Sequence, residues 1–240
     1  MRVIQRKYLS QLTFMPKLFP VNCYLVEEGE SITLVDAALP YGAAGISKAI
    51  EDSGKRLTRI VLTHAHEDHV GALDRLKVRY PEAKVYISKR DARVLAGDRT
   101  LQADEPQTKI RGSVPKAIKT RPDILVHEGD SIGSLLVIGT PGHTPGSISL
   151  LDTRTRALLA GDSFHTRGGL TVTGHLRWIF PFPAMATWNK EAALASASKL
   201  ADYQPTLLAT GHGEMLTDPA EEMRKALIAA KHQMKMDQGN

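Results

Sequence analysis

Thr63-His64-Ala65-His66-Glu67-Asp68-His69 is the most informative stretch of this sequence, with three imidazoles and acidic side chains between them. His64 and His66 are two residues apart, so in extended backbone both side chains point the same way and can chelate one ion. Asp68 and His69 begin the turn that follows and point elsewhere, which suits a second ion nearby. Imidazole and carboxylate are ligands of borderline divalent metals such as zinc. The stretch predicts a metal centre, and further ligands downstream argue against surface or helix-capping histidines.

Three further candidate ligands lie downstream, each just after an apolar run. His143 follows the run LLVIG, Asp162 follows RALLA, and His212 follows TLLA. Small residues beside them, such as Gly142 and Gly213, allow tight turns that bring these side chains inward. Any one of the three alone would read as an ordinary loop residue. The repeated arrangement argues against coincidence and adds all three to the predicted centre.

The pattern around these residues predicts strands and helices in two successive groups. A hairpin is expected over 23–37, followed by buried strands at 59–64 and 84–88. Helices are expected at 43–54, from His66 to just before Pro81, within 89–122, at 190–203 and from Asp218 onward. Four successive strands are expected at 124–130, 134–140, 146–152 and 156–162, with a last one at 205–211. This order predicts an α/β (α+β) fold in a single domain, 1–240, with two mixed sheets packed face to face and helices on the outer faces.

Composition excludes several classes of protein. The 240 residues suffice for one large core, and no apolar run is long enough to span a bilayer. The first residues lack the uninterrupted apolar run of a signal peptide, and the single cysteine, Cys23, excludes an internal disulfide. The densest basic stretch, 109–121, has no aromatic residue that could stack on a base. We therefore expect a cytoplasmic protein that acts on a small molecule, without a nucleic-acid partner or a membrane.

The His-x-His-x-Asp-His motif, followed in order by His, Asp and His, resembles the metallo-β-lactamase superfamily of hydrolases over residues 20–218. The resemblance implies an αββα sandwich with a dinuclear site at one edge of the sheets. It assigns the first ion to His64, His66 and His143. It assigns the second ion to Asp68, His69 and His212, with Asp162 bridging both. Zinc is the expected metal, and iron and manganese accept the same ligands.

The ligand set predicts a dinuclear metal-dependent hydrolase that acts on a small ester or lactone, such as an acyl homoserine lactone-like molecule. Two ions would share a hydroxide that attacks the carbonyl carbon, and Asp68, beside this nucleophile, would carry the proton to the leaving group. Asp36 ends an apolar run, and we expect it to hydrogen bond to a ligand histidine.

Several alternative activities stay open at this stage. They are a thioesterase of the glyoxalase II type, a phosphoester hydrolase and a weak β-lactamase. The common zinc β-lactamases have a cysteine where this chain has Asp162, and glyoxalase II adds a C-terminal region that binds glutathione. Lactonases that cleave acyl homoserine lactones share the ligand set but place a tyrosine after the bridging acid, and no tyrosine lies between Asp162 and Tyr203. A non-enzymatic metal-binding module is disfavoured, because a closed structural site needs no bridging acid.

The segment 164–188 is rich in apolar and aromatic residues for a stretch without helical periodicity. Since it directly follows Asp162, we expect it to form an apolar wall over the metal centre. The substrate-contacting residues predicted there are His165, Trp178, Phe180 and Phe182, with His175 a weaker candidate. A loop packed only for stability and a homodimer contact are the alternatives.

Overall fold

The computed structural model describes residues 1–115 and 118–238. The chain divides into two compact units, and each is described on its own. The first unit consists of Met1–Arg99 and Ser113–His127, and the second consists of Thr100–Gly112 and Glu128–Asn240. That the whole chain forms one domain stays a prediction.

The first unit is built on a seven-stranded mixed sheet with the strands in sequence order. Its strands are β1 (Arg2–Arg6), β2 (Leu9–Phe14), β3 (Val21–Glu28), β4 (Ser31–Val35), β5 (Arg56–Val61), β6 (Lys84–Ser88) and β7 (Ile124–Val126). Neighbours from β1 to β4 pair antiparallel, and neighbours from β4 to β7 pair parallel. The expected hairpin is confirmed as β3 and β4, in which the run Val21–Val26 is buried throughout.

The helices of the first unit are short. They are η1 (Pro40–Gly42, 3₁₀), α1 (Ala43–Asp52), α2 (Glu67–Val70), α3 (Leu73–Arg79) and α4 (Lys89–Leu95). The prediction of a single helix that starts at His66 is wrong, because the structure has two helices there, α2 and α3. The N–H groups of Gly71 and Ala72 donate to the carbonyl groups of Ala38 and Ala37, in the loop after β4, and the helix is interrupted there.

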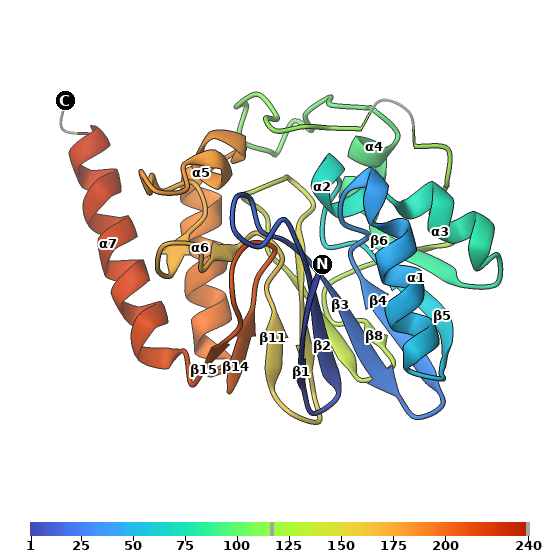
Figure 1. The fold of residues 1–240 in the computed structure, drawn as a ribbon. Helices are drawn as coiled ribbons and strands as arrows, with labels where there is room; N and C mark the ends of the chain where they lie inside the picture. Colours follow the sequence, from blue (N-terminus) through green and yellow to red (C-terminus); the bar gives the residue numbers. More distant parts are fainter. Residues whose placement is uncertain (116–117, 239–240) are drawn as a thin grey trace. The chain divides into compact units, whose positions relative to one another are not determined.

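The second unit contains a six-stranded mixed sheet with the order β15-β14-β11-β10-β9-β8 and a small two-stranded sheet. The strands are β8 (Ser131–Ile132), β9 (Leu135–Gly139), β10 (Ile148–Asp152), β11 (Ala157–Leu159), β14 (Leu207–Ala209) and β15 (Leu216–Thr217), with β12 (Phe164–His165) and β13 (Thr171–Val172) apart. Its helices are α5 (Phe182–Ala186), α6 (Lys190–Asp202) and α7 (Ala220–Gln238). In Figure 1, α6 and α7 run side by side, and both contribute to one apolar core with Phe164, Val172 and Leu208.

Two details of this second group of strands differ from the prediction. The strand expected at 124–130 is shorter than predicted, since β7 covers only Ile124–Val126, and it pairs with β6 in the sheet of the first unit. The segment 164–188 is not irregular throughout, since it contains the β12–β13 hairpin and α5. The predicted fold class is confirmed: two mixed sheets, each with helices. Within the described residues, no helix combines the length and the apolar character that a membrane span requires.

Candidate metal centre

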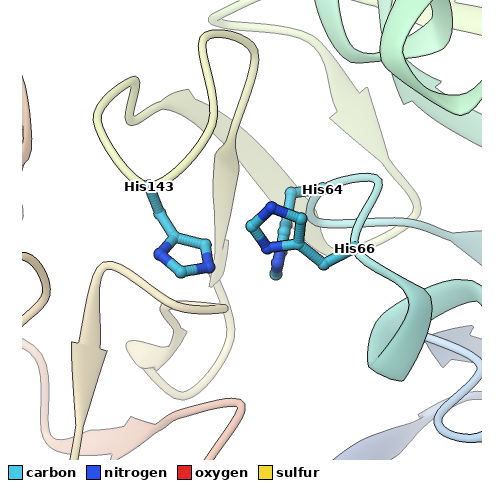
Figure 2. A group of neighbouring side chains, drawn as sticks. All are labelled: His64, His66 and His143. Atoms are coloured by element: carbon cyan, nitrogen blue, oxygen red, sulfur yellow. The ribbon is translucent and has the colours of Figure 1, made fainter. Parts of the chain in front are cut away.

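The loop after β5 and the short helix α2 that follows it carry three buried imidazoles of the first unit. The rings of His64 and His66 meet edge to face with centroids 4.8 Å apart, and those of His64 and His69 are 4.0 Å apart. Figure 2 shows His64 and His66 on this loop. Donor atoms of His64 and His66 lie within 4.8 Å of each other, and so do those of Asp68 and His69. The first unit therefore brings together the four ligands predicted from its motif.

Asp36 holds this loop from the end of β4. Its carboxylate accepts the Thr63 N–H at 2.8 Å and the Thr63 hydroxyl at 2.8 Å, and it lies 2.8 Å from Nδ1 of His69. With the proton on Nδ1, His69 presents the lone pair of Nε2, which is the form that binds a metal ion. Asp36 adopts a left-handed backbone conformation, with φ of 62°. That strain is tolerated because Asp36 makes these contacts with both residues.

Asp91 also stabilises the loop that carries His64 and His66, a role that the sequence did not predict. Its buried carboxylate accepts the N–H of Ala65, between the two first histidines, at 2.9 Å. Asp91 lies in the first turn of α4, where its own N–H donates to the hydroxyl of Ser88, the N-cap residue. The pattern Ser-x-x-Asp at a helix start was visible in the sequence as a capping signal. The contact with Ala65 was not, because it joins residues far apart in the chain.

In the second unit, the three predicted ligands lie close together, with His143 and His212 on either side of Asp162 in the sequence and both next to its carboxylate. Nε2 of His143 lies 3.3 Å from Oδ2 of Asp162, and Nε2 of His212 lies 3.1 Å from the same oxygen. All three side chains are buried. His143 is in the loop that follows β9, labelled in Figure 2. Its Nδ1 lies 3.1 Å from the Thr173 hydroxyl and 3.2 Å from the Thr187 hydroxyl, two contacts that the sequence reading did not anticipate.

These donors fit a divalent metal ion. When His143 donates its Nδ1 proton to a threonine hydroxyl, its Nε2 lone pair faces the Asp162 carboxylate. Two lone pairs facing each other inside the protein are stabilised only by a proton or a cation between them. Metal–ligand distances near 2.0–2.2 Å are compatible with donor atoms about 3 Å apart. Imidazole and carboxylate are also the donor chemistry of zinc, iron and manganese sites.

Close backbone approach explains two glycines beside these ligands. Gly142 has φ of 143°, and a Cβ atom there would lie 2.3 Å from Cα of Ala193 in α6. Gly213 has φ of 107°, and a Cβ atom there would lie 2.3 Å from Oγ1 of Thr166. Only glycine accommodates both the backbone conformation and the contact. The two turns thus place His143 and His212 through packing as well as through hydrogen bonds.

The four predicted substrate-contacting residues occupy different environments in the second unit. His165 and Phe180 are buried, Phe182 is 53% exposed and Trp178 is 86% exposed. The Phe180 ring contacts three rings, with centroid distances of 5.8 Å to His165, 5.5 Å to Phe182 and 5.4 Å to His212. His175 is buried elsewhere, with Nδ1 3.2 Å from Oε1 of Gln233.

Asp36→Asn is expected to weaken metal binding by about 10- to 100-fold, because the amide cannot accept from Thr63 and His69 as the carboxylate does. Competition with a chromogenic chelator measures the affinity. Asp74→Asn is the matched control, since the Asp74 carboxylate accepts from the N–H groups of Lys119 and Thr120 and from the Thr120 hydroxyl, away from the histidine motif in the sequence. Equal affinities for the parent and Asp36→Asn would contradict the supporting role of Asp36.

Comparison with known proteins identifies the family. The profile of the metallo-beta-lactamase superfamily matches residues 16–212. The chain therefore belongs to the metallo-beta-lactamase superfamily. It is 57% identical to YobT of Bacillus subtilis, over 96% of this chain and 99% of that protein. It is 34% identical to the probable metallo-hydrolase YflN of the same organism, over 82% of this chain and 81% of that protein.

Two further similarities concern proteins whose names state a ligand or an activity. A hydroxyacylglutathione hydrolase of Rhodopseudomonas palustris is 32% identical over 66% of this chain and 54% of that protein. The crystal structure of TTHA1623 in a di-iron-bound form superposes with a TM-score of 0.65 at 27% identity, covering 88% of this chain and 96% of that one.

Proposed function

We propose that this protein is a dinuclear metal-dependent hydrolase that cleaves a small ester or lactone. The observation that carries the proposal is the convergence of His143 and His212 on one oxygen of Asp162. A structural metal site is closed by its ligands and needs no carboxylate shared between two ions. Membership of the superfamily and the similarity to a probable metallo-hydrolase support the same class of reaction.

The proposed ligands follow the order of the family motif. His64, His66 and His143 would hold one ion, Asp68, His69 and His212 would hold the other, and Asp162 would bridge them. The metal is zinc, iron or manganese, and the di-iron form of TTHA1623 makes iron a specific candidate. When bound, two such ions would lower the pKa of a water molecule toward neutrality and polarise the carbonyl group of the substrate.

Asp68 would transfer a proton to the leaving group during hydrolysis. Its side chain is partly exposed, and a carboxylate has two oxygens, so one can bind an ion while the other accepts a proton. The carboxyl group would then donate this proton to the leaving oxygen of the ester or lactone. The α2 backbone positions Asp68 immediately before His69, whose Nδ1 is held by Asp36.

Thioester hydrolysis is the second candidate. The similarity to a hydroxyacylglutathione hydrolase favours it, since that protein's name states a thioester substrate class. Thioester and ester carbonyl groups are attacked by the same nucleophile, so the ligand set is equally suited to both. The leaving group distinguishes them, because a thiolate needs less help from a proton donor than an alkoxide does.

A panel of chromogenic substrates tests the proposal on protein with a measured metal content. Esters, lactones, thioesters and phosphodiesters are compared, with Asp162→Ala as the inactive control. Turnover highest for esters or lactones supports the first candidate, and turnover highest for thioesters supports the second. Absence of hydrolysis of every substrate class by the metal-loaded protein would contradict both.

The exposed aromatic residues before and within α5 are expected to bind the acyl part of the substrate. Trp178→Ala and Phe182→Ala should raise KM for decanoyl esters by up to about 30-fold, with little change for acetyl esters, because an aromatic contact contributes about 2 kcal/mol at 25 cal/mol per Å². Ile228→Ala on α7 is the control, as it removes a similarly exposed apolar side chain. Equal penalties for short and long chains, with a changed elution volume, would favour a homodimer contact instead.

A further inference from the structure

Trp188 contacts two segments of the second unit that are far apart in the sequence. Its side chain is only 4% exposed, and its indole N–H donates to the carbonyl group of Thr108 at 2.7 Å. In return, the Thr108 hydroxyl donates to the carbonyl group of Trp188 at 3.1 Å. A buried indole N–H usually finds an acceptor, and here a residue 80 positions earlier in the chain supplies it. The two residues therefore form a reciprocal pair of hydrogen bonds.

Trp188 and the residues on either side of it hold the turn that carries the predicted ligand His143. The Thr187 hydroxyl lies 3.2 Å from Nδ1 of His143. The N–H of Trp188 donates to the carbonyl group of His143 at 3.0 Å, and the N–H of Asn189 donates to that of Gly142 at 2.9 Å. Because three consecutive residues contact this turn, a displacement of Trp188 changes the orientation of the His143 ring, on which metal affinity depends.

The partner of the Trp188 indole lies in the segment 100–112, which contains no helix or strand and is mostly exposed. The Glu105 carboxylate accepts the N–H of Gln102 at 2.9 Å, and the Gln107 amide donates to the carbonyl groups of Gln102 and Glu105 at 2.8 and 2.6 Å. These bonds are local, so they shape the segment without joining it to the ligand turn. Exposed irregular segments open at a lower free-energy cost than core strands do. The bonds with Trp188 are therefore broken when the segment undocks.

We propose that Trp188 is a positioning residue that couples docking of the segment 100–112 to metal binding by His143. The docked segment fixes the indole, and the backbone beside the indole fixes the turn that presents Nε2 of His143. A coupling free energy is reciprocal, so an ion bound through His143 stabilises the docked segment by the same factor. This inference rests on the metal ligands of the proposed function, and it does not depend on which bond the protein hydrolyses.

Zinc affinity measures the coupling in one direction. Trp188→Phe is expected to weaken zinc binding about 10-fold in competition with a chromogenic chelator, because phenylalanine keeps a packing ring but has no N–H to donate. Thr108→Val removes the hydroxyl of an exposed residue and is expected to weaken binding by a smaller factor. Thr153→Val is the matched control and is expected to bind zinc as the parent does. It removes an exposed hydroxyl of the same unit that donates to the carbonyl group of Ser134 at 3.0 Å.

The melting temperature distinguishes this role from simple packing. Trp188→Phe with a retained melting temperature and a parental zinc affinity would overturn the proposal, because the indole N–H would then have no influence on the metal site. If this variant does not fold, Thr108→Val decides by the same criterion.

Limited proteolysis measures the coupling in the other direction. Trypsin cleaves after Lys109, an exposed residue next to Thr108, and the cleavage rate follows the fraction of molecules in which the segment is undocked. Excess zinc is expected to slow this cleavage about 10-fold in the parent protein and to leave it nearly unchanged in Trp188→Phe. A peptide substrate in the same reaction controls for any effect of zinc on trypsin.

The outcomes separate this inference from the proposed function. A parent protein that binds zinc but is cleaved after Lys109 at the same rate with and without it would overturn the coupling and leave the metal centre in place. A parent protein that binds no zinc, iron or manganese would overturn both proposals.

Discussion

Asp162→Ala is expected to release both metal ions and to lower hydrolysis by about a thousandfold or more, the largest functional effect of any single change in this chain. Nε2 atoms of His143 and His212 lie 3.3 and 3.1 Å from the same carboxylate oxygen of Asp162. Without that oxygen, His143 and His212 lose the carboxylate that both adjoin, and any remaining ion lacks the bridging ligand. Elemental analysis of protein purified without chelators measures the ions per chain.

Two controls distinguish loss of the bridging ligand from loss of the fold. Asp152→Ala removes another buried aspartate of the second unit, one that pairs with Arg154, and is expected to retain the metal. His212→Ala is expected to empty mainly one of the two sites. Two ions per chain in Asp162→Ala would show that Asp162 does not bridge the ions, and the role proposed for this residue would be wrong.

Gly142→Ala is expected to destabilise the protein by about 2–6 kcal/mol, the largest stability effect of a single methyl group. A Cβ atom would lie 2.3 Å from Cα and 2.4 Å from N of Ala193, and these backbone atoms of α6 cannot turn aside as a side chain would. Overpacking and the left-handed backbone conformation, with φ of 143°, each cost about 1–3 kcal/mol. In a chain of this length, the melting temperature should fall by about 10 °C, as thermal denaturation would measure.

Gly129→Ala separates the two contributions to this cost. Gly129 has φ of 90°, and a Cβ atom there would meet nothing within 4 Å. Its replacement should cost only the conformational part, about 1–2 kcal/mol. Similar melting temperatures for the two variants would show that α6 yields to the added methyl group, and that the close approach of Gly142 does not position His143.

The sequence was sufficient to predict the parts of this protein that depend on near neighbours. The β3–β4 hairpin, α1 and the strand before the histidine motif followed from apolar runs, turn residues and helical spacing. His64 and His66 share one side of the loop because they are two residues apart, and the structure brings their donor atoms within 4.8 Å. The predicted contact between Asp36 and a histidine lies between Asp36 and His69, at 2.8 Å.

Other features depend on residues that are distant in sequence, and local pattern could not reveal them. The helix predicted from His66 is interrupted at Gly71, because the N–H groups of Gly71 and Ala72 donate to carbonyl groups in the loop after β4. The partners of His143 are Thr173 and Thr187, some 30 and 44 residues away. Aromatic composition alone could not separate Phe180, buried against His212, from Trp178, which is 86% exposed.

The sequence by itself therefore determined which side chains could bind a metal and roughly where the strands carrying them lie. Tertiary structure decided how each of those side chains is oriented: the Asp36 carboxylate lies 2.8 Å from Nδ1 of His69, and the hydroxyl groups of Thr173 and Thr187 lie 3.1 and 3.2 Å from Nδ1 of His143. The physical reason is that periodicity and turn chemistry act over a few residues. Ring orientation depends on hydrogen bonds and packing that form only when distant segments of the chain come together.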